Sequence, residues 1–179
     1  MGRRRRRQAE GTQTRDAAFY SAWIDFTKGL GAPVGAALAG SREFIAQAWR
    51  LKQQMGGAMR QAGIIAAGGV FALRRHVKRL AEDHANARRL AEGLAAIPGV
   101  VLDPATVETN IVFFDVRGPL DAEAAVSAML ARGVRMGVMG PRTIRAVTHL
   151  DVSGAQVERA IDVARAVLDA TARPGGSGR

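Results

Sequence analysis

The sequence predicts an α/β fold, and three patterns in it support this fold class. Apolar residues recur at three- and four-residue steps over residues 77–97, which predicts a long amphipathic helix that ends at Pro98 and Gly99. Residues 134–138 and 143–149 instead alternate from one residue to the next, as strands with one buried face do. Because short strand patterns alternate with helical ones after Gly99, we expect a small α/β domain in the second half of the chain.

Before the long helix, the pattern predicts two short strands and two helices. Mostly apolar residues at 23–26 and 34–38 predict the strands. Ser41 can cap a helix with apolar side chains along one face, and the glycines at 56–57 end that helix. Small residues are frequent at 58–75, which predicts a second helix that can pack closely against a neighbour.

The remaining elements follow from cap residues and apolar runs. Strands are expected at 100–102 and 109–116, and Asp121 can cap the helix that follows them. Ser153 and Gln156 have the spacing of a capping box, so the last helix begins there. The predicted buried face of this helix consists of Val157, Ala160, Ile161, Ala164, Val167 and Leu168.

The composition limits the classes of site that the protein can contain. With 179 residues, 47% of them hydrophobic, the chain can form a globular core. It has no cysteine, which excludes disulfides, thiolate metal sites and a catalytic thiol. The three histidines do not have metal-ligand spacing, and no apolar run is long enough to span a membrane, so we expect no metal and no membrane partner. A cytoplasmic location is the expectation that fits this composition.

Positive charge is concentrated near the N-terminus. Residues 1–15 hold six arginines, five of them in the run Arg3–Arg7, against one glutamate, and so carry half of the net charge of +10. Such a run is either a solvated tail or a contact for nucleic acid. We expect disordered tails at 1–18 and 173–179.

The candidate chemical group is Lys28. The apolar run at 23–26 leads into Thr27 and Lys28, after which glycine and alanine predominate, so a flat ligand could lie close to the backbone. We expect these surroundings to keep water from the amine, which favours its uncharged, nucleophilic form and suits a Schiff-base lysine. The alternative is an ordinary solvated lysine in a turn.

The segment around Lys28 resembles that of a known enzyme family. Residues 27–40, TKGLGAPVGAALAG, resemble the cofactor-lysine segment of the low-specificity L-threonine aldolases, which are pyridoxal phosphate enzymes of the aspartate-aminotransferase fold, fold type I. The similarity spans residues 22–172, whereas residues 1–18 do not resemble the family. It continues through SREFIAQAW, GGAMRQAGIIAAGG, RLAEDHANARRLAEGL, ETNIVFFDV and IRAVTHLDVS.

The resemblance implies a fold and a division into domains. A full family member is about twice as long, and the resemblance identifies this chain with its C-terminal half. Residues 19–75 would then be the end of the large cofactor-binding domain that carries the lysine. Residues 76–172 would hold the long linking helix and the small C-terminal α/β domain.

The resemblance also implies roles for three residues. Lys28 would hold pyridoxal phosphate as a Schiff base, Arg145 would bind the substrate carboxylate, and Arg60 would contact the cofactor phosphate. From the residues alone, Arg145 could equally face solvent on an edge strand, and Arg60 could form a structural salt bridge. We expect His84 to be a core residue, and His149 either to make a structural hydrogen bond or to line the site.

The implied function is that of a pyridoxal phosphate-dependent carbon–carbon lyase. Its substrates would be small β-hydroxy amino acids, L-threonine or L-allo-threonine, and its products glycine and acetaldehyde. Family members are homo-oligomers. In the family the phosphate-binding turn and the partner of the pyridine nitrogen come from the N-terminal half, so we expect this chain to be inactive by itself. The alternative is a non-catalytic basic α/β module that contacts nucleic acid through its arginine run.

Overall fold

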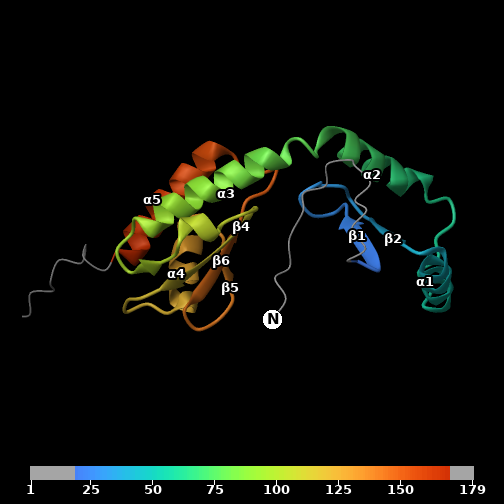
Figure 1. The fold of residues 1–179 in the computed structure, drawn as a ribbon. Coiled ribbons are helices and arrows are strands. Elements are labelled where there is room, and N and C mark those ends of the chain that lie inside the picture. The colour runs from blue at the N-terminus through green and yellow to red at the C-terminus, as the bar shows by residue number, and fades with distance from the viewer. Residues whose placement is uncertain (1–18, 170–179) are drawn as a thin grey trace, which may run out of the picture.

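The computed structural model describes residues 19–169, and Figure 1 shows two groups of elements joined by the turn between α2 and α3. The N-terminal segment (residues 19–75) contains β1 (Ser21–Asp25), β2 (Ala36–Gly40), α1 (Arg42–Gln54) and α2 (Gly63–Arg75). The C-terminal segment (residues 76–169) contains α3 (Leu80–Ala95), β3 (Val100–Val101), the 3-10 helix η1 (Pro104–Thr106), β4 (Ile111–Val116), α4 (Ala122–Leu130), β5 (Gly137–Val138), β6 (Thr143–Val147) and α5 (Gly154–Leu168). The α/β class predicted from the sequence is confirmed.

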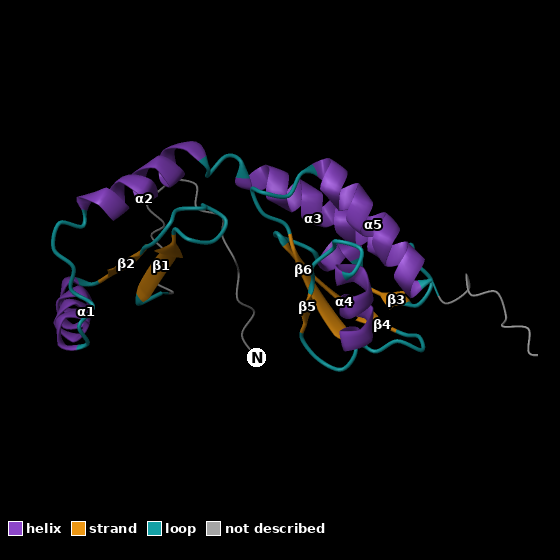
Figure 2. Ribbon diagram, turned by 180° about the vertical axis from the view of Figure 1, so that it is seen from behind, coloured by secondary structure: helices purple, strands orange, loops and turns teal. Residues whose placement is uncertain are grey.

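The C-terminal segment is an antiparallel sheet covered by helices on one face. The strand order is β3-β4-β6-β5, and β4 pairs with β6 so that Phe113 lies opposite Arg145. Buried and exposed residues alternate along β4, with Phe114 buried and Phe113 exposed. Figure 2 shows α3, α4 and α5 gathered beside this sheet. The other face, which carries Phe113 and Arg145, is not covered by any of the described elements.

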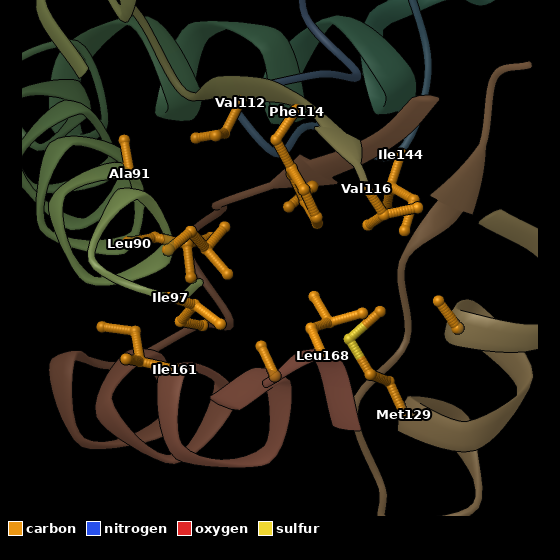
Figure 3. Close-up of a cluster of buried hydrophobic side chains, with 14 of the residues drawn as sticks. Leu90, Ala91, Ile97, Val112, Phe114, Val116, Met129, Ile144, Ile161 and Leu168 are labelled. Atoms are coloured by element: carbon orange, nitrogen blue, oxygen red, sulfur yellow. The ribbon is translucent and has the colours of Figure 1, made fainter. Parts of the chain in front are cut away.

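The core of the C-terminal segment lies between the sheet and these helices. Figure 3 shows Leu90 and Ile97 near α3, Phe114 and Ile144 from the strands, and Met129 from α4 around a shared interior. The predicted apolar face of α5 is confirmed: Val157, Ile161, Ala164 and Leu168 are buried, and Ala160 and Val167 are partly buried against the same cluster. Its capping box at Ser153 and Gln156 is also present.

The N-terminal segment has little core of its own. Strands β1 and β2 form a two-stranded antiparallel sheet. Its buried cluster consists of Leu30, Ala32 and Ala72, with Phe26 and Leu80 packed against it. Helix α1, which Ser41 caps as predicted, buries no residue. Large apolar side chains here are exposed: Trp23, Ile24, Leu38, Trp49, Met55 and Ile64.

Two expectations about α2 and α3 were wrong. Helix α2 begins at Gly63 and not at residue 58, because the backbone turns at Gly56 and at Gln61, both of which have positive φ. On α3, His84 is only half-buried, and the buried polar residue is its neighbour Asp83. Arg79 forms an ion pair with Asp83, and this compensates for burying the carboxylate.

The expected division at residues 75 and 76 falls near the turn between α2 and α3 and stays a prediction. The expected tails at 1–18 and 173–179 lie outside the described residues. Among the helices of residues 19–169, none is long and apolar enough to cross a membrane.

Candidate functional site

Lys28 lies in the lysine loop, which we define as residues 26–35 between β1 and β2. The loop is closed by backbone hydrogen bonds: Phe26 N–H donates to the Gly35 carbonyl (3.0 Å) and Ala32 N–H to the Phe26 carbonyl (2.7 Å). Inside it, Gly31 N–H donates to the Lys28 carbonyl (2.8 Å), and Gly31 has a φ of 65°. A left-handed backbone favours glycine, so the sequence allows this tight turn directly after Lys28.

A short polar motif fixes the chain just before Lys28. The backbone N–H and the hydroxyl of Thr27 both donate to Asp25 Oδ1, at 2.8 and 2.5 Å. The Thr27 hydroxyl, then its N–H and the charge of Lys28 lower the pKa of Asp25 below its usual range. Lys28 Nζ lies 4.0 Å from Asp25 Oδ2. Sequence reasoning missed this motif, although an Asp two residues before a Thr is a common turn signal.

The expectation that water is kept from the lysine amine was wrong for the described residues. The Lys28 side chain is 78% exposed. Glycine and alanine bring the backbone close to a neighbour, but they provide no side-chain bulk to cover a long amine. The described part of the chain therefore places this amine in solvent, within reach of a ligand.

The C-terminal segment contacts the lysine loop from the carbonyl side. His149 Nε2 lies 2.9 Å from the Lys28 carbonyl oxygen, and His76 Nδ1 lies 2.7 Å from the Leu30 carbonyl oxygen. A Cβ atom added at Gly31 would overlap Leu150 Cδ2, so the loop backbone lies directly against this side chain. Of the two roles expected for His149, the structure shows the hydrogen bond. Its partner is the backbone carbonyl of Lys28.

Arg145 lies on β6, opposite Phe113 and Gly137 on the neighbouring strands. Its side chain is exposed on the sheet face without helices, and its guanidinium makes no hydrogen bond or ion pair with any residue that the structure describes. Strand β6 ends at Val147, and two residues later His149 reaches the Lys28 carbonyl. The structure thus joins the end of the Arg145 strand to the lysine loop.

Arg60 is not connected to these residues. It is exposed in a bend between α1 and α2, before the helix and not inside its first turn as expected. Within residues 19–169 it has no ion-pair or hydrogen-bond partner, so its suggested role stays a prediction. No group of three or more His, Cys, Asp or Glu side chains in the same range is placed to hold a metal ion.

Comparison with known proteins relates this chain to lyases and aldolases. A model of the beta-eliminating lyase family matches residues 11–117, beginning inside the segment that we expected to be unlike the family. The chain is 41% identical over 151 residues to the low-specificity L-threonine aldolase of Escherichia coli K12, covering 83% of this chain and 44% of that protein. Low-specificity L-threonine aldolase 1 of Arabidopsis thaliana is 35% identical over 139 residues, covering 76% and 39%.

Another relative is named for a different reaction. An alanine racemase of Cochliobolus carbonum is 33% identical over 156 residues, covering 82% of this chain and 38% of that protein. The chain thus spans about two fifths of the length of these relatives. None of them gives support to the nucleic-acid alternative, and the arginine run lies outside the described residues.

Solved structures share the fold. A Listeria monocytogenes protein described as an L-allo-threonine aldolase superposes with a TM-score of 0.65 at 19% identity, covering 84% of this chain and 45% of that one. An Exiguobacterium protein described as an aromatic amino acid beta-eliminating lyase/threonine aldolase gives 0.65 at 24% identity, covering 83% and 45%. The expected fold type is confirmed.

Proposed function

Because the chain belongs to the beta-eliminating lyase family, we propose that it forms the C-terminal part of a pyridoxal phosphate-dependent carbon–carbon lyase. In this proposal its substrates are L-threonine and L-allo-threonine, and its products are glycine and acetaldehyde. The observation that carries the proposal is that an accessible amine and a guanidinium without an ion-pair partner lie on two parts of the fold that contact each other. Lys28 is exposed in its loop, and Arg145 lies on β6, which leads to His149, the residue that contacts that loop.

The residues present fit a flat aldehyde cofactor and an amino acid substrate. Lys28 Nζ is an exposed primary amine on a loop with little side-chain bulk, so it would hold the cofactor through its aldehyde, with loss of water. Arg145 presents a planar, doubly donating group, which suits a carboxylate better than the point charge of a lysine. Arg60, exposed after two glycines, is the proposed contact for the cofactor phosphate.

Each residue then has a defined task. Pyridoxal phosphate, when bound, accepts the electron pair released as the Cα–Cβ bond of the substrate breaks. Arg145 orients the substrate through its carboxylate, so that the bond to be broken is held in one direction. Lys28 would carry a proton at Nζ, and Cα of the substrate needs one proton to become glycine. The substrate hydroxyl loses its proton as the aldehyde forms.

The test adds the part of a relative that this chain does not match. The chain is co-expressed with the part of the Escherichia coli relative that it does not match, and the complex is given pyridoxal phosphate and L-allo-threonine. We expect glycine and acetaldehyde in equal amounts, and almost none from the Lys28→Ala complex or from the chain by itself. Because one relative is named an alanine racemase, L-alanine is offered in parallel. Racemisation of L-alanine, with no acetaldehyde formed from L-allo-threonine, would overturn the proposed reaction.

The finer features stay part of this proposal. We propose that residues 19–75 and 76–172 belong to two domains, and that the protein acts in the cytoplasm as a homo-oligomer. Limited proteolysis tests the division, because cleavage should concentrate in the turn at residues 76–79 and leave a resistant C-terminal fragment. Sedimentation of the co-expressed complex tests the oligomeric state.

A further inference from the structure

We propose that His149 is a positioning residue for Lys28, and that it sets the distance between the lysine and the strand that carries Arg145. This inference rests on the proposed function, because it assigns His149 a part in that site. The central observation is the hydrogen bond between His149 Nε2 and the Lys28 carbonyl oxygen (2.9 Å), which joins residues 121 positions apart in the sequence.

The chemistry of this contact fixes which atoms carry hydrogen. A carbonyl oxygen can only accept, so His149 Nε2 must carry the hydrogen in this bond. The other ring nitrogen, His149 Nδ1, lies 3.1 Å from Asp151 Oδ1. The Lys28 carbonyl is shared, because it also accepts from Gly31 N–H. One His149 nitrogen therefore directly supports the turn that presents the amine.

The C-terminal core holds the backbone around His149, so the position of His149 relative to that core is fixed. Thr148 is buried, its hydroxyl donates to the Asp83 carbonyl (2.6 Å), and its N–H donates to the Asn110 carbonyl (3.0 Å). After His149, Val152 N–H donates to the His149 carbonyl (2.8 Å). His149 is thus anchored on both sides by residues that belong to the same segment as Arg145.

Two neighbouring contacts strengthen the same junction. His76 Nδ1 bonds to the Leu30 carbonyl (2.7 Å), and Leu150 lies against the bare backbone of Gly31. The lysine loop is therefore seated on three side chains from the C-terminal segment. A site that needs an amine and a guanidinium at a set distance depends on such supporting contacts, because small displacements of reacting groups reduce rates strongly.

The experiment uses a matched pair of variants in the full chain. The amide nitrogen of glutamine can reach the position of His149 Nε2, so His149→Gln can still donate to the Lys28 carbonyl. Asparagine is shorter, and its amide nitrogen reaches only the position of Nδ1, so His149→Asn loses that bond. Asp151→Asn is the control that leaves the Nε2 bond in place.

The first readout is hydrogen exchange of the Gly31 and Ala32 amides, which are bonded within the lysine loop. We expect His149→Asn to exchange on the order of fivefold faster, the effect of one neutral hydrogen bond, and His149→Gln and Asp151→Asn to match the unmodified chain. The unfolding midpoint of the C-terminal core should be the same in all four proteins. Equal exchange in His149→Asn and the unmodified chain, or a lowered midpoint without local change, would overturn the proposal.

The second readout is selective labelling of the lysine. The amine condenses with the aldehyde of pyridoxal phosphate with loss of water, and borohydride then supplies hydride to give a stable secondary amine that mass spectrometry can map. The chain has three lysines, so Lys52 and Lys78 are internal references. We expect the share of label on Lys28 to fall in His149→Asn and to be kept in His149→Gln. An unchanged share in His149→Asn would contradict a positioning role.

The two proposals fail in different ways. If the unmodified chain shows no preference for Lys28 over the reference lysines, the proposed function loses its support, and the hydrogen-exchange comparison still decides whether His149 holds the loop. If Lys28 is preferred in every variant alike and the exchange rates do not differ, the proposed function stands and the role of His149 is wrong.

Discussion

At the scale of single residues, Arg145 is a cation whose side chain has no partner among the described residues, and its strand leads to His149, which contacts the Lys28 carbonyl. In the co-expressed complex we expect Arg145→Ala to lower kcat/KM for L-allo-threonine by about 10- to 100-fold, because hydrogen bonds to a charged group contribute roughly 1.5–3 kcal/mol. Arg145→Lys should recover only part of this loss, since it keeps the charge and loses the two-pronged geometry.

The control for this prediction is Arg165→Ala. Arg165 lies on α5 and pairs with Asp162 on the helix surface, so its loss removes one positive charge away from the sheet face that carries Arg145. We expect no change in kcat/KM. Equal losses in the two alanine variants would mean that general charge, and not the position of Arg145, affects substrate binding.

Asp25 gives a second prediction at the residue scale. Hydrogen bonds from Thr27 lower the pKa of Asp25 in the folded chain, so the stability it contributes is complete above its usual value of 3.8. That contribution is lost as the pH falls through the lower folded value. We expect the NMR shift of the Thr27 amide to titrate with a midpoint below 3.8, and Asp25→Asn, which still accepts the hydrogen bonds, to give a flat curve. A midpoint above 3.8 would contradict the structure.

At the scale of elements, two helices with the same kind of cap differ in what the cap supports. Ser153 caps α5, whose apolar face is buried in the main core, and Ser41 caps α1, which buries no residue. We expect Ser153→Ala to lower the free energy of unfolding of the core by about 1 kcal/mol. Ser41→Ala should leave that transition unchanged, because α1 is not part of its cooperative unit. Urea unfolding followed by circular dichroism compares the two, and equal losses would show that α1 unfolds together with the core.

At the scale of the whole molecule, stability is unevenly distributed. The main cluster is drawn entirely from residues 87–168, whereas the buried cluster of the N-terminal segment contains only Leu30, Ala32 and Ala72. In the full chain we therefore expect the amides of β4, β6 and α5 to exchange slowest and those of β1, β2 and α1 fastest. A fragment of residues 76–179 should keep the cooperative unfolding transition of the full chain, and a fragment of residues 1–75 should show none. Slow exchange in α1 of the isolated chain would contradict this division of stability.

Most of the C-terminal segment could be predicted from local patterns in the sequence. The apolar run in residues 109–116, the capping box at Ser153 and Gln156 and the apolar face of α5 are local patterns, and local hydrogen bonds and burial on one face enforce them. Boundaries near the glycines were less predictable, since Gly56 and Gln61 adopt positive φ and delay the start of α2. The choice of Asp83 over His84 as the buried residue depended on its ion pair with Arg79, which a periodic pattern does not reveal.

For the candidate site, the sequence indicated Lys28 and Arg145 through short motifs, but it did not indicate how they are related in space. The exposure of Lys28 depends on which side chains surround the loop, and glycine and alanine leave it uncovered. The contact of His149 with the Lys28 carbonyl spans 121 residues, so no local spacing could predict it. This contact depends on long-range packing, because the folding of β6 against β4 and α3 places Thr148 and His149 where His149 can reach the loop.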